Sequence, residues 1–301
     1  MKIHEYQARD ILAKAGVPVP PGVLVESVEQ AAGAYKSVVR DAGLGDNGLA
    51  VVKAQVHAGG RGKAGFVKLV RSPEEATEAA RFMLSTRMKS PQTPPEGLEV
   101  KRLLVAAGVE IAREFYLAVT TDRGLRQNVL IASAEGGVEI EHVAATRPDA
   151  ILKQPIHPHL GLLENQARRL AFDLGFTGKQ VNQAAKIMMA LARTYTEKDC
   201  TIAEINPLIV TPPTAGDPDG RVMAIDAKFN FDDNALFRQK AIADLFDPSE
   251  ENASELRAAR FGLSYIQLSG DIGCLVNGAG LAMSTMDIIK HSGGQPANFL
   301  D

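Results

Sequence analysis

Cysteine is scarce in this 301-residue sequence, which has only two. Cys200 and Cys274 lie far apart, and each is in or beside an apolar run. That placement is typical of reduced thiols and argues against a disulfide framework or a cysteine-based metal cluster. We therefore expect a soluble cytoplasmic protein.

The sequence also lacks an excess of charge and any long apolar run. It has 33 basic and 36 acidic residues, a formal net charge of −3, so no global field attracts nucleic acid or an anionic membrane. The N-terminal stretch has no apolar core of a secretory signal, and runs such as "IMMALA" are too short to span a bilayer. Any phosphate must therefore be bound by a local group of cations.

The order of the elements that the sequence predicts indicates an α/β protein of about two domains. Helix start signals occur as a capping-box pair and as an N-cap serine followed by proline and glutamate: Ser27 with Gln30, and Ser72 with Pro73 and Glu75. The stretch 178–199 carries five residues at helical spacing, which predicts a core-facing stripe: Val181, Ala184, Met188, Leu191 and Tyr195. Strands are expected at 49–56, 65–70, 99–109, 113–124 and 127–133.

The C-terminal part predicts a different arrangement. After a polar, helical segment at about 240–260, the stretch from Ile272 to Asp301 predicts a strand, a glycine turn, a helix and the start of another strand. One such βα unit cannot bury both faces of a parallel sheet. We therefore expect either that the chain is truncated or that another polypeptide covers this unit.

A glycine loop rich in cations, "VHAGGRGKAG", separates the first two of these strands. It is not a Walker A loop, because Ala64 stands where a serine or threonine would reach the metal and His57 stands where the motif begins with glycine. It also precedes a strand, whereas the dinucleotide fingerprint opens a helix. The pattern predicts a β-loop-β flap that covers phosphates, with charge from Lys53 and Arg61. The alternative is a mobile surface hairpin with solvated cations.

A predicted β-hairpin at 200–231 carries the second group of candidate residues. Glu204 and Asn206 are two positions apart and face the same side of one strand, and Asp226 lies on the returning strand among apolar neighbours. Carboxylate and amide oxygens without histidine or cysteine suit Mg²⁺. The alternative is turn chemistry before Pro207 with solvated acids. Together, the flap and the hairpin predict a site that encloses a Mg²⁺–nucleotide complex.

Two further motifs carry weaker signals. "VNGAGLAM" predicts a strand and a glycine turn into a helix, whose N-terminus could face a ligand. Met283 stands in place of the third glycine of the dinucleotide fingerprint, so a tight βα turn is the better explanation. His157 and His159 flank a proline, and no third ligand is near them in the sequence, so we expect no metal there.

Several of these motifs together resemble the β subunits of succinyl-CoA synthetases (succinate–CoA ligases). The resemblance covers the chain from residue 1 to 301 and rests on "HEYQA", "KAQVHAGGRGKAG", "EGGVEIE", "AEINPL", "DNALFR", "GCLVNGAGLAM" and "GGQPANFLD". It implies an ATP-grasp fold at 1–240, a linker at 241–262 and, at 263–301, the beginning of a flavodoxin-like parallel α/β CoA-ligase domain. It also implies that this last domain continues beyond the sequence given.

The resemblance further implies roles for individual residues. Phosphates of ATP would be contacted by Lys53, Gly60, Arg61 and Gly62, and the base and its pocket by Ala106, Val109 and Glu114. Asn206 and Asp226 would bind Mg²⁺, Glu204 would face a phosphohistidine of the α subunit, and Asn277 would help to bind substrate. The family commonly has a glutamate at one of the first two hinge positions, where this chain has Ala106 and Ala107, so the choice between ATP and GTP stays open.

The activity that the resemblance implies is a phosphoryl relay in an αβ or α2β2 assembly. ATP phosphorylates a histidine of the α subunit, succinate becomes an acyl phosphate, and CoA displaces the phosphate. Malate–CoA ligase β subunits share the same motifs and remain an alternative. A non-catalytic, nucleotide-binding short form is a third interpretation, which the early end of the chain and its altered hinge motivate.

Overall fold

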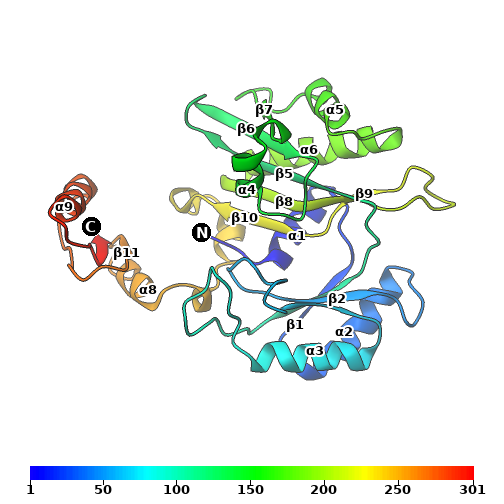
Figure 1. Ribbon diagram of the computed structural model, residues 1–301, viewed down its shortest axis with the longest axis horizontal. Coiled ribbons are helices and arrows are strands. Elements are labelled where there is room, and N and C mark those ends of the chain that lie inside the picture. The colour runs from blue at the N-terminus through cyan, green and yellow to red at the C-terminus, as the bar shows by residue number, and fades with distance from the viewer. The chain divides into compact units, whose positions relative to one another are not determined.

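The structure is a computed structural model that describes all residues from 1 to 301. The chain divides into two compact units, Met1–Phe246 and Asp247–Asp301 (Figure 1). None of its helices combines the length and the hydrophobicity that a membrane crossing requires.

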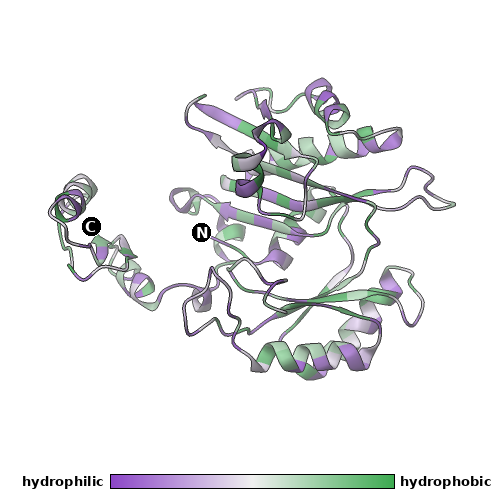
Figure 2. Ribbon diagram, viewed as in Figure 1, coloured by the Kyte–Doolittle hydropathy of each residue, from purple (hydrophilic) through white to green (hydrophobic).

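The first unit contains a four-stranded antiparallel sheet in the order β1-β4-β2-β3, on which α2 and α3 pack (Figure 1). Figure 2 shows both hydrophobic and hydrophilic residues along α3, as expected of a helix with one buried face. Tyr35, Val52, Met83 and Val105 belong to the core between sheet and helices. The elements are β1 (Gly22–Val25), α2 (Val28–Asp41), β2 (Ala50–Ala54), β3 (Val67–Val70), α3 (Pro73–Ser85) and β4 (Leu103–Ala107).

The first unit also contains a larger antiparallel sheet in the order β10-β8-β5-β6-β7, with β9 paired to β8. The strands of this sheet and the remaining helices of the first unit are α1 (Glu5–Lys14), β5 (Arg113–Asp122), β6 (Gln127–Ser133), α4 (Ile140–Thr146), η1 (Pro148–Ala150), β7 (Leu152–Pro155), α5 (Glu164–Asp173), α6 (Lys179–Glu197), β8 (Cys200–Val210), β9 (Val222–Ala224), β10 (Ala227–Phe231), η2 (Asp233–Ala235) and α7 (Lys240–Ala243). Helix α6 packs on β5 and β8, and all five residues of its predicted stripe are buried. The prediction of a core-facing stripe is confirmed.

The predicted helix starts are confirmed by their hydrogen bonds. Ser72 Oγ accepts from the Glu75 N–H at 3.1 Å, and Pro73 is the first residue of α3. Gln30 Oε1 accepts from the Ser27 N–H at 3.3 Å, which completes the capping box of α2. These bonds satisfy donors that have no partner within the helices themselves.

The β-loop-β prediction is also confirmed. Strands β2 and β3 are antiparallel neighbours, with Lys53 opposite Val67, and the glycine loop connects them. The predicted hairpin forms as well, but its returning strand is divided into β9 and β10 at Ile225–Asp226. Because of this break, Asp226 belongs to neither strand, and its side chain need not follow the alternation of side chains between the two faces of the sheet.

The second unit comprises η3 (Pro248–Glu250), α8 (Ala253–Ala259), β11 (Tyr265–Gln267), α9 (Ala279–His291) and β12 (Asn298–Leu300). The predicted strand at 272–276 is wrong. Only Ile272 forms a parallel bridge, with Pro296, and Asn298 replaces the next ladder bonds by pairing its side-chain amide with the N–H and C=O of Cys274 at 2.9 and 2.7 Å. Strand β12 pairs instead with β11 in antiparallel register.

Candidate functional site

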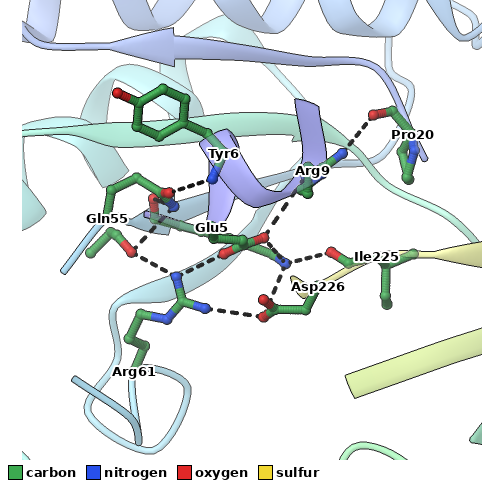
Figure 3. Close-up of polar contacts among 10 residues, drawn as sticks. Glu5, Tyr6, Arg9, Pro20, Gln55, Arg61, Ile225 and Asp226 are labelled. Atoms are coloured by element: carbon green, nitrogen blue, oxygen red, sulfur yellow. Dashed lines mark hydrogen bonds and ion pairs between the residues drawn. The ribbon is translucent and has the colours of Figure 1, made fainter. Parts of the chain in front are cut away.

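Glu5, Lys53, Arg61 and Asp226 come from four separate segments and meet in one cluster of ion pairs (Figure 3). Lys53 Nζ lies 2.8 Å from Glu5 Oε1, and Arg61 Nη1 lies 2.7 Å from Glu5 Oε2. Arg61 Nη2 donates to Asp226 Oδ2 at 3.0 Å, and Lys53 Nζ is 3.6 Å from the same oxygen. The two predicted phosphate-binding cations and one predicted metal ligand therefore share a site.

Backbone carbonyls fix the direction of both cations. Lys53, at the end of β2, donates to the carbonyl of Ile225 at 3.0 Å, and Arg61 Nη1 donates to that of Ala54 at 3.0 Å. The loop closes on itself through the Phe66 N–H, which donates to the Arg61 carbonyl at 2.9 Å. Gly60 has a φ of +79°, a conformation that residues with a side chain rarely adopt. The glycine loop thus folds its arginine back toward the strand that carries the lysine.

Next to Gly60 and Arg61, Gly62 is open around its Cα, since an added Cβ would meet no atom within 4 Å. A backbone of this kind can approach a phosphate closely. The positions of Lys53, Arg61 and the glycines are therefore compatible with the predicted flap.

The charges of the cluster change the acidity of its carboxyl groups. Burial alone would raise the pKa of Glu5, but Lys53, Arg61 and Arg9 outweigh it and lower this pKa to about 2. Burial, together with the charge of Glu5, raises the pKa of Asp226. Glu5 is thus the permanent anion of the cluster, and Asp226 is the carboxylate whose charge depends more on its surroundings.

Asn206, the other predicted metal ligand, binds a loop of the same unit. Its Oδ1 accepts from the Gly137 N–H at 2.8 Å, and its Nδ2 donates to the Val138 carbonyl at 3.1 Å. A carbonyl oxygen has two lone pairs, so this arrangement leaves one acceptor position of Oδ1 for a cation. Asn206 follows Glu204 on β8, and its peptide bond to Pro207 is cis.

Glu204 is held by a tyrosine that sequence reasoning missed. Tyr116 on β5 donates its hydroxyl to Glu204 Oε2 at 3.2 Å, and Lys228 lies opposite Glu204 in the register of β8 and β10. Burial raises the pKa of Glu204, while Lys228 and the tyrosine hydrogen bond act against this rise. Burial and the neighbouring Glu204 also raise the pKa of Tyr116. The hydroxyl therefore stays a donor to this carboxylate throughout the neutral range.

The predicted base-binding segment lies at the end of β4. Ala106 is buried in the centre of the sheet, opposite Gly22 on one side and Val51 on the other, whereas Val109 follows the strand. Glu114, on β5, lies against the loop that Asn206 binds, because a Cβ added to Gly137 would be 2.4 Å from Glu114 Oε2. Gly137 therefore lies between a predicted nucleotide residue and a predicted metal ligand.

The remaining candidates lie elsewhere. Asn277 is exposed in the second unit, just before α9. His157 Nδ1 accepts the N–H groups of His159 and Leu160 at 3.1 Å each, which gives this histidine a role in a turn.

Glu5 is the central residue that sequence reasoning missed. It belongs to the motif "HEYQA", but no role was expected for it. The helical spacing of Glu5 could have identified it. Glu5 lies three positions before Ala8 and seven before Leu12, so all three share one face of α1, and Ala8 and Leu12 are fully buried. A carboxylate on the apolar face of a helix requires a cationic partner.

Comparisons with known proteins show which family the chain resembles. Residues 2–210 match the family model described as "ATP-grasp domain". The chain is 54% identical over 301 residues to the protein named succinate–CoA ligase (ADP-forming) subunit beta of Chloroherpeton thalassium (strain ATCC 35110 / GB-78), and covers 74% of its length. It is 50% identical over 301 residues to the protein of the same name from Bacillus licheniformis, with 75% of that protein covered.

Solved structures with low identity share the fold. ATP citrate lyase from Methanothrix soehngenii, in complex with citrate and coenzyme A, superimposes with a TM-score of 0.67 at 18% identity over 99% of this chain and 71% of that one. The dinucleotide-forming acetyl-coenzyme A synthetase 1 of Ca. Korarchaeum cryptofilum has a TM-score of 0.56 at 18% identity, over 77% of this chain and 93% of that one.

The fold and the family-model match thus define an ATP-grasp protein, which confirms the ATP-grasp part of the predicted fold class. Within this class, the identity along the whole chain shows that it belongs to the family of succinate–CoA ligase (ADP-forming) β subunits. The resemblance predicted from the sequence is confirmed.

Proposed function

We propose that this chain is the nucleotide-binding β subunit of an ATP-dependent succinate–CoA ligase. The observation that carries the proposal is the cluster in which Lys53 and Arg61 converge beside Asp226. Two cations next to a partly exposed carboxylate form a place where phosphate oxygens and a cation can bind together. The names of the relatives give succinate as the substrate and ADP as a product, and this chain matches these relatives along its own whole length.

Lys53 and Arg61 bind and orient the phosphates of the nucleotide in this proposal, and the glycine loop covers them with backbone N–H groups from Gly60 to Gly62. Val109 and Ala106 lie toward the base, and Glu114 lies toward the nucleotide pocket. The choice of ATP over GTP rests on the names of the relatives, which are ADP-forming ligases.

The donor set fits Mg²⁺, since Asp226 offers a carboxylate oxygen and Asn206 an amide oxygen with a remaining lone pair. When bound, Mg²⁺ neutralises charge on the phosphoryl oxygens. Because Arg61 and Lys53 now pair with Asp226, the phosphates must replace this carboxylate as the partner of these donors when the nucleotide binds.

Glu204 acts at the next stage of the proposed relay. Its carboxylate, fixed by Tyr116, faces the phosphorylated histidine of an α subunit, and Asn277 contributes to the substrate site. A partner is proposed because the relatives are named as subunits. The partner would supply the histidine, in an αβ or α2β2 assembly, and the reaction would take place in the cytoplasm.

The test is an assay of the chain in complex with an α subunit. With ATP, Mg²⁺, CoA and succinate, we expect formation of succinyl-CoA and ADP in equal amounts. Malate in place of succinate should give much less product, and a large preference for malate would assign the chain to a malate–CoA ligase. ATP binding that is indifferent to Mg²⁺, without any activity in the complex, would favour a non-catalytic nucleotide-binding protein.

A further inference from the structure

Glu5 lies behind the two cations, away from solvent. Its side chain is 3% exposed, whereas the side chains of Arg61 and Asp226 are 16% and 27% exposed. The exposed fractions of the side chains therefore increase from Glu5, through Lys53 and Arg61, to Asp226 at the more accessible side. Figure 3 shows the Arg61 guanidinium bonded to both Glu5 and Asp226. A ligand that enters from the accessible side meets Asp226 and the cations before it reaches Glu5.

Each oxygen of the Glu5 carboxylate holds a different cation. Oε1 pairs with Lys53 and Oε2 with Arg61, at 2.8 and 2.7 Å, while Arg9 is more distant at 3.9 Å. This fixes the ends of two long side chains that otherwise have many rotamers. Glu5 also holds the two cations from the buried side. The donors that now pair with Asp226 therefore point to the accessible side, where a phosphate can accept from them.

Stability alone is a weak explanation for this arrangement. Taking a carboxylate and two cations out of water is costly, and well-packed apolar side chains often replace buried ion pairs without loss of stability. The charged cluster does, however, give two phosphate-binding groups a fixed position before the ligand arrives. Pre-positioned charged groups bind without paying the entropy of ordering at that moment.

We propose that Glu5 is a positioning residue for nucleotide binding, which holds Lys53 and Arg61 in the orientation that receives the phosphates. This inference rests on the proposed function. Without the Glu5 charge, both cations would turn fully toward Asp226, and the nucleotide would have to break stronger pairs with that carboxylate. Glu5 thus acts through the two cations and does not itself contact the ligand.

Titration calorimetry of the full chain with Mg-ATP and with adenosine tests the proposal. Glu5→Gln keeps the size of the side chain and removes its charge, and we expect it to weaken Mg-ATP binding at least tenfold while changing adenosine binding less than twofold. Glu5→Asp keeps the charge but is one methylene shorter, so it should restore part of the loss. Asp199→Asn, which breaks the distant pair with Arg238, is the matched control and should change neither affinity.

The sign of the effect separates positioning from simple charge. Removing an anion makes the cluster more positive, so a purely electrostatic role predicts tighter Mg-ATP binding by Glu5→Gln, and that result would overturn the proposal. Equal losses for Mg-ATP and adenosine would also overturn it, because a general structural defect affects both. If Glu5→Gln does not fold, Glu5→Asp decides, again by comparing its loss of Mg-ATP affinity with its loss of adenosine affinity. Failure of the unaltered chain to bind Mg-ATP would refute the proposed function itself.

Discussion

Arg61 and Asp226, which are 165 positions apart in the sequence, form an ion pair of 3.0 Å that joins the glycine loop to the break between β9 and β10. The resemblance assigns one of these residues to phosphate and the other to metal. Their pairing means that each must leave the other when a metal–nucleotide complex binds. Phosphate binding and metal binding should therefore depend on each other.

Asp226→Asn tests this dependence. In the presence of EDTA, we expect the variant to bind ATP at least as tightly as the unaltered chain, because Arg61 and Lys53 no longer face a carboxylate. With Mg²⁺, the unaltered chain should gain affinity that the variant does not, a difference of about tenfold, or ~1.4 kcal/mol. Titration calorimetry in both buffers measures it.

His157→Asn is the control for this measurement, because His157 lies in a turn and its Nδ1 accepts two backbone N–H groups. It should leave the response to Mg²⁺ unchanged. Equal effects of the two substitutions would argue against Asp226 as a metal ligand.

Gly137→Ala and Gly161→Ala form a matched pair that tests the loop between Glu114 and Asn206. Both glycines have nearly the same positive φ, +71° and +69°, so both substitutions should cost about 1–2 kcal/mol in backbone strain. Only at Gly137 would the new Cβ collide with Glu114, at 2.4 Å, whereas at Gly161 it would meet nothing within 4 Å.

Because the carboxylate end of Glu114 can shift, we expect urea unfolding to show similar losses of stability for both variants. Calorimetry should show weaker Mg-ATP binding for Gly137→Ala alone, since Glu114 is displaced only there. The affinity is the decisive reading. If both variants bound Mg-ATP like the unaltered chain, the loop at Gly137 would have no part in positioning Glu114 or Asn206.

The fold was largely predictable because local patterns and tertiary packing agree. The stripe of α6 and the caps of α2 and α3 are determined by residues close together in the sequence, and the structure confirms them. The strand expected at 272–276 failed because the Asn298 side chain takes the hydrogen bonds of Cys274 that a strand would have formed. Such a competition between a side chain and the backbone ladder leaves no trace in the periodicity of the sequence.

The site was predictable only where a residue stands out from its neighbours in the sequence. Lys53, Arg61 and Asp226 stand out by charge next to glycines or apolar residues, and the structure brings them together. Glu5 and Tyr116 act through partners that are 48 to 88 positions away in the sequence. Spacing cannot show which distant groups a side chain meets, so residues that orient other residues are found only from the fold.

Glu204→Gln should raise stability in a way that depends on pH. Burial raises the pKa of Glu204 in the folded state above its ordinary value of 4.5. Between 4.5 and this raised pKa, the folded state therefore binds more protons than the unfolded state. Stability then falls as pH rises through this window, and the glutamine variant avoids the fall. Below pH 4.5 the two proteins should unfold alike, and at neutral pH the variant should melt at a higher temperature than the unaltered chain.

Tyr116→Phe gives the opposite result, because the charged carboxylate loses a donor that stabilises it. We expect this variant to melt below the unaltered chain at neutral pH and to approach it in acid. Thermal unfolding followed by circular dichroism between pH 4 and 8 measures both variants. A shift that stayed constant across this range would show that titration of Glu204 does not cause it.

Cys200 should be chemically inert in the folded protein. Burial raises the pKa of its thiol from 9.0 to about 12, so at pH 8 the thiolate fraction is roughly 10⁻⁴ where an ordinary thiol has roughly 10⁻¹. The residue is also only 7% exposed, which restricts access of a reagent. In a Cys274→Ser background, iodoacetamide at pH 8 should leave the folded chain unmodified over hours, as measured by intact mass. The same reaction in 8 M urea should add one label within minutes, because unfolding returns the thiol to water. Rapid labelling without urea would mean that the end of α6 and the start of β8 open far more often than their packing indicates.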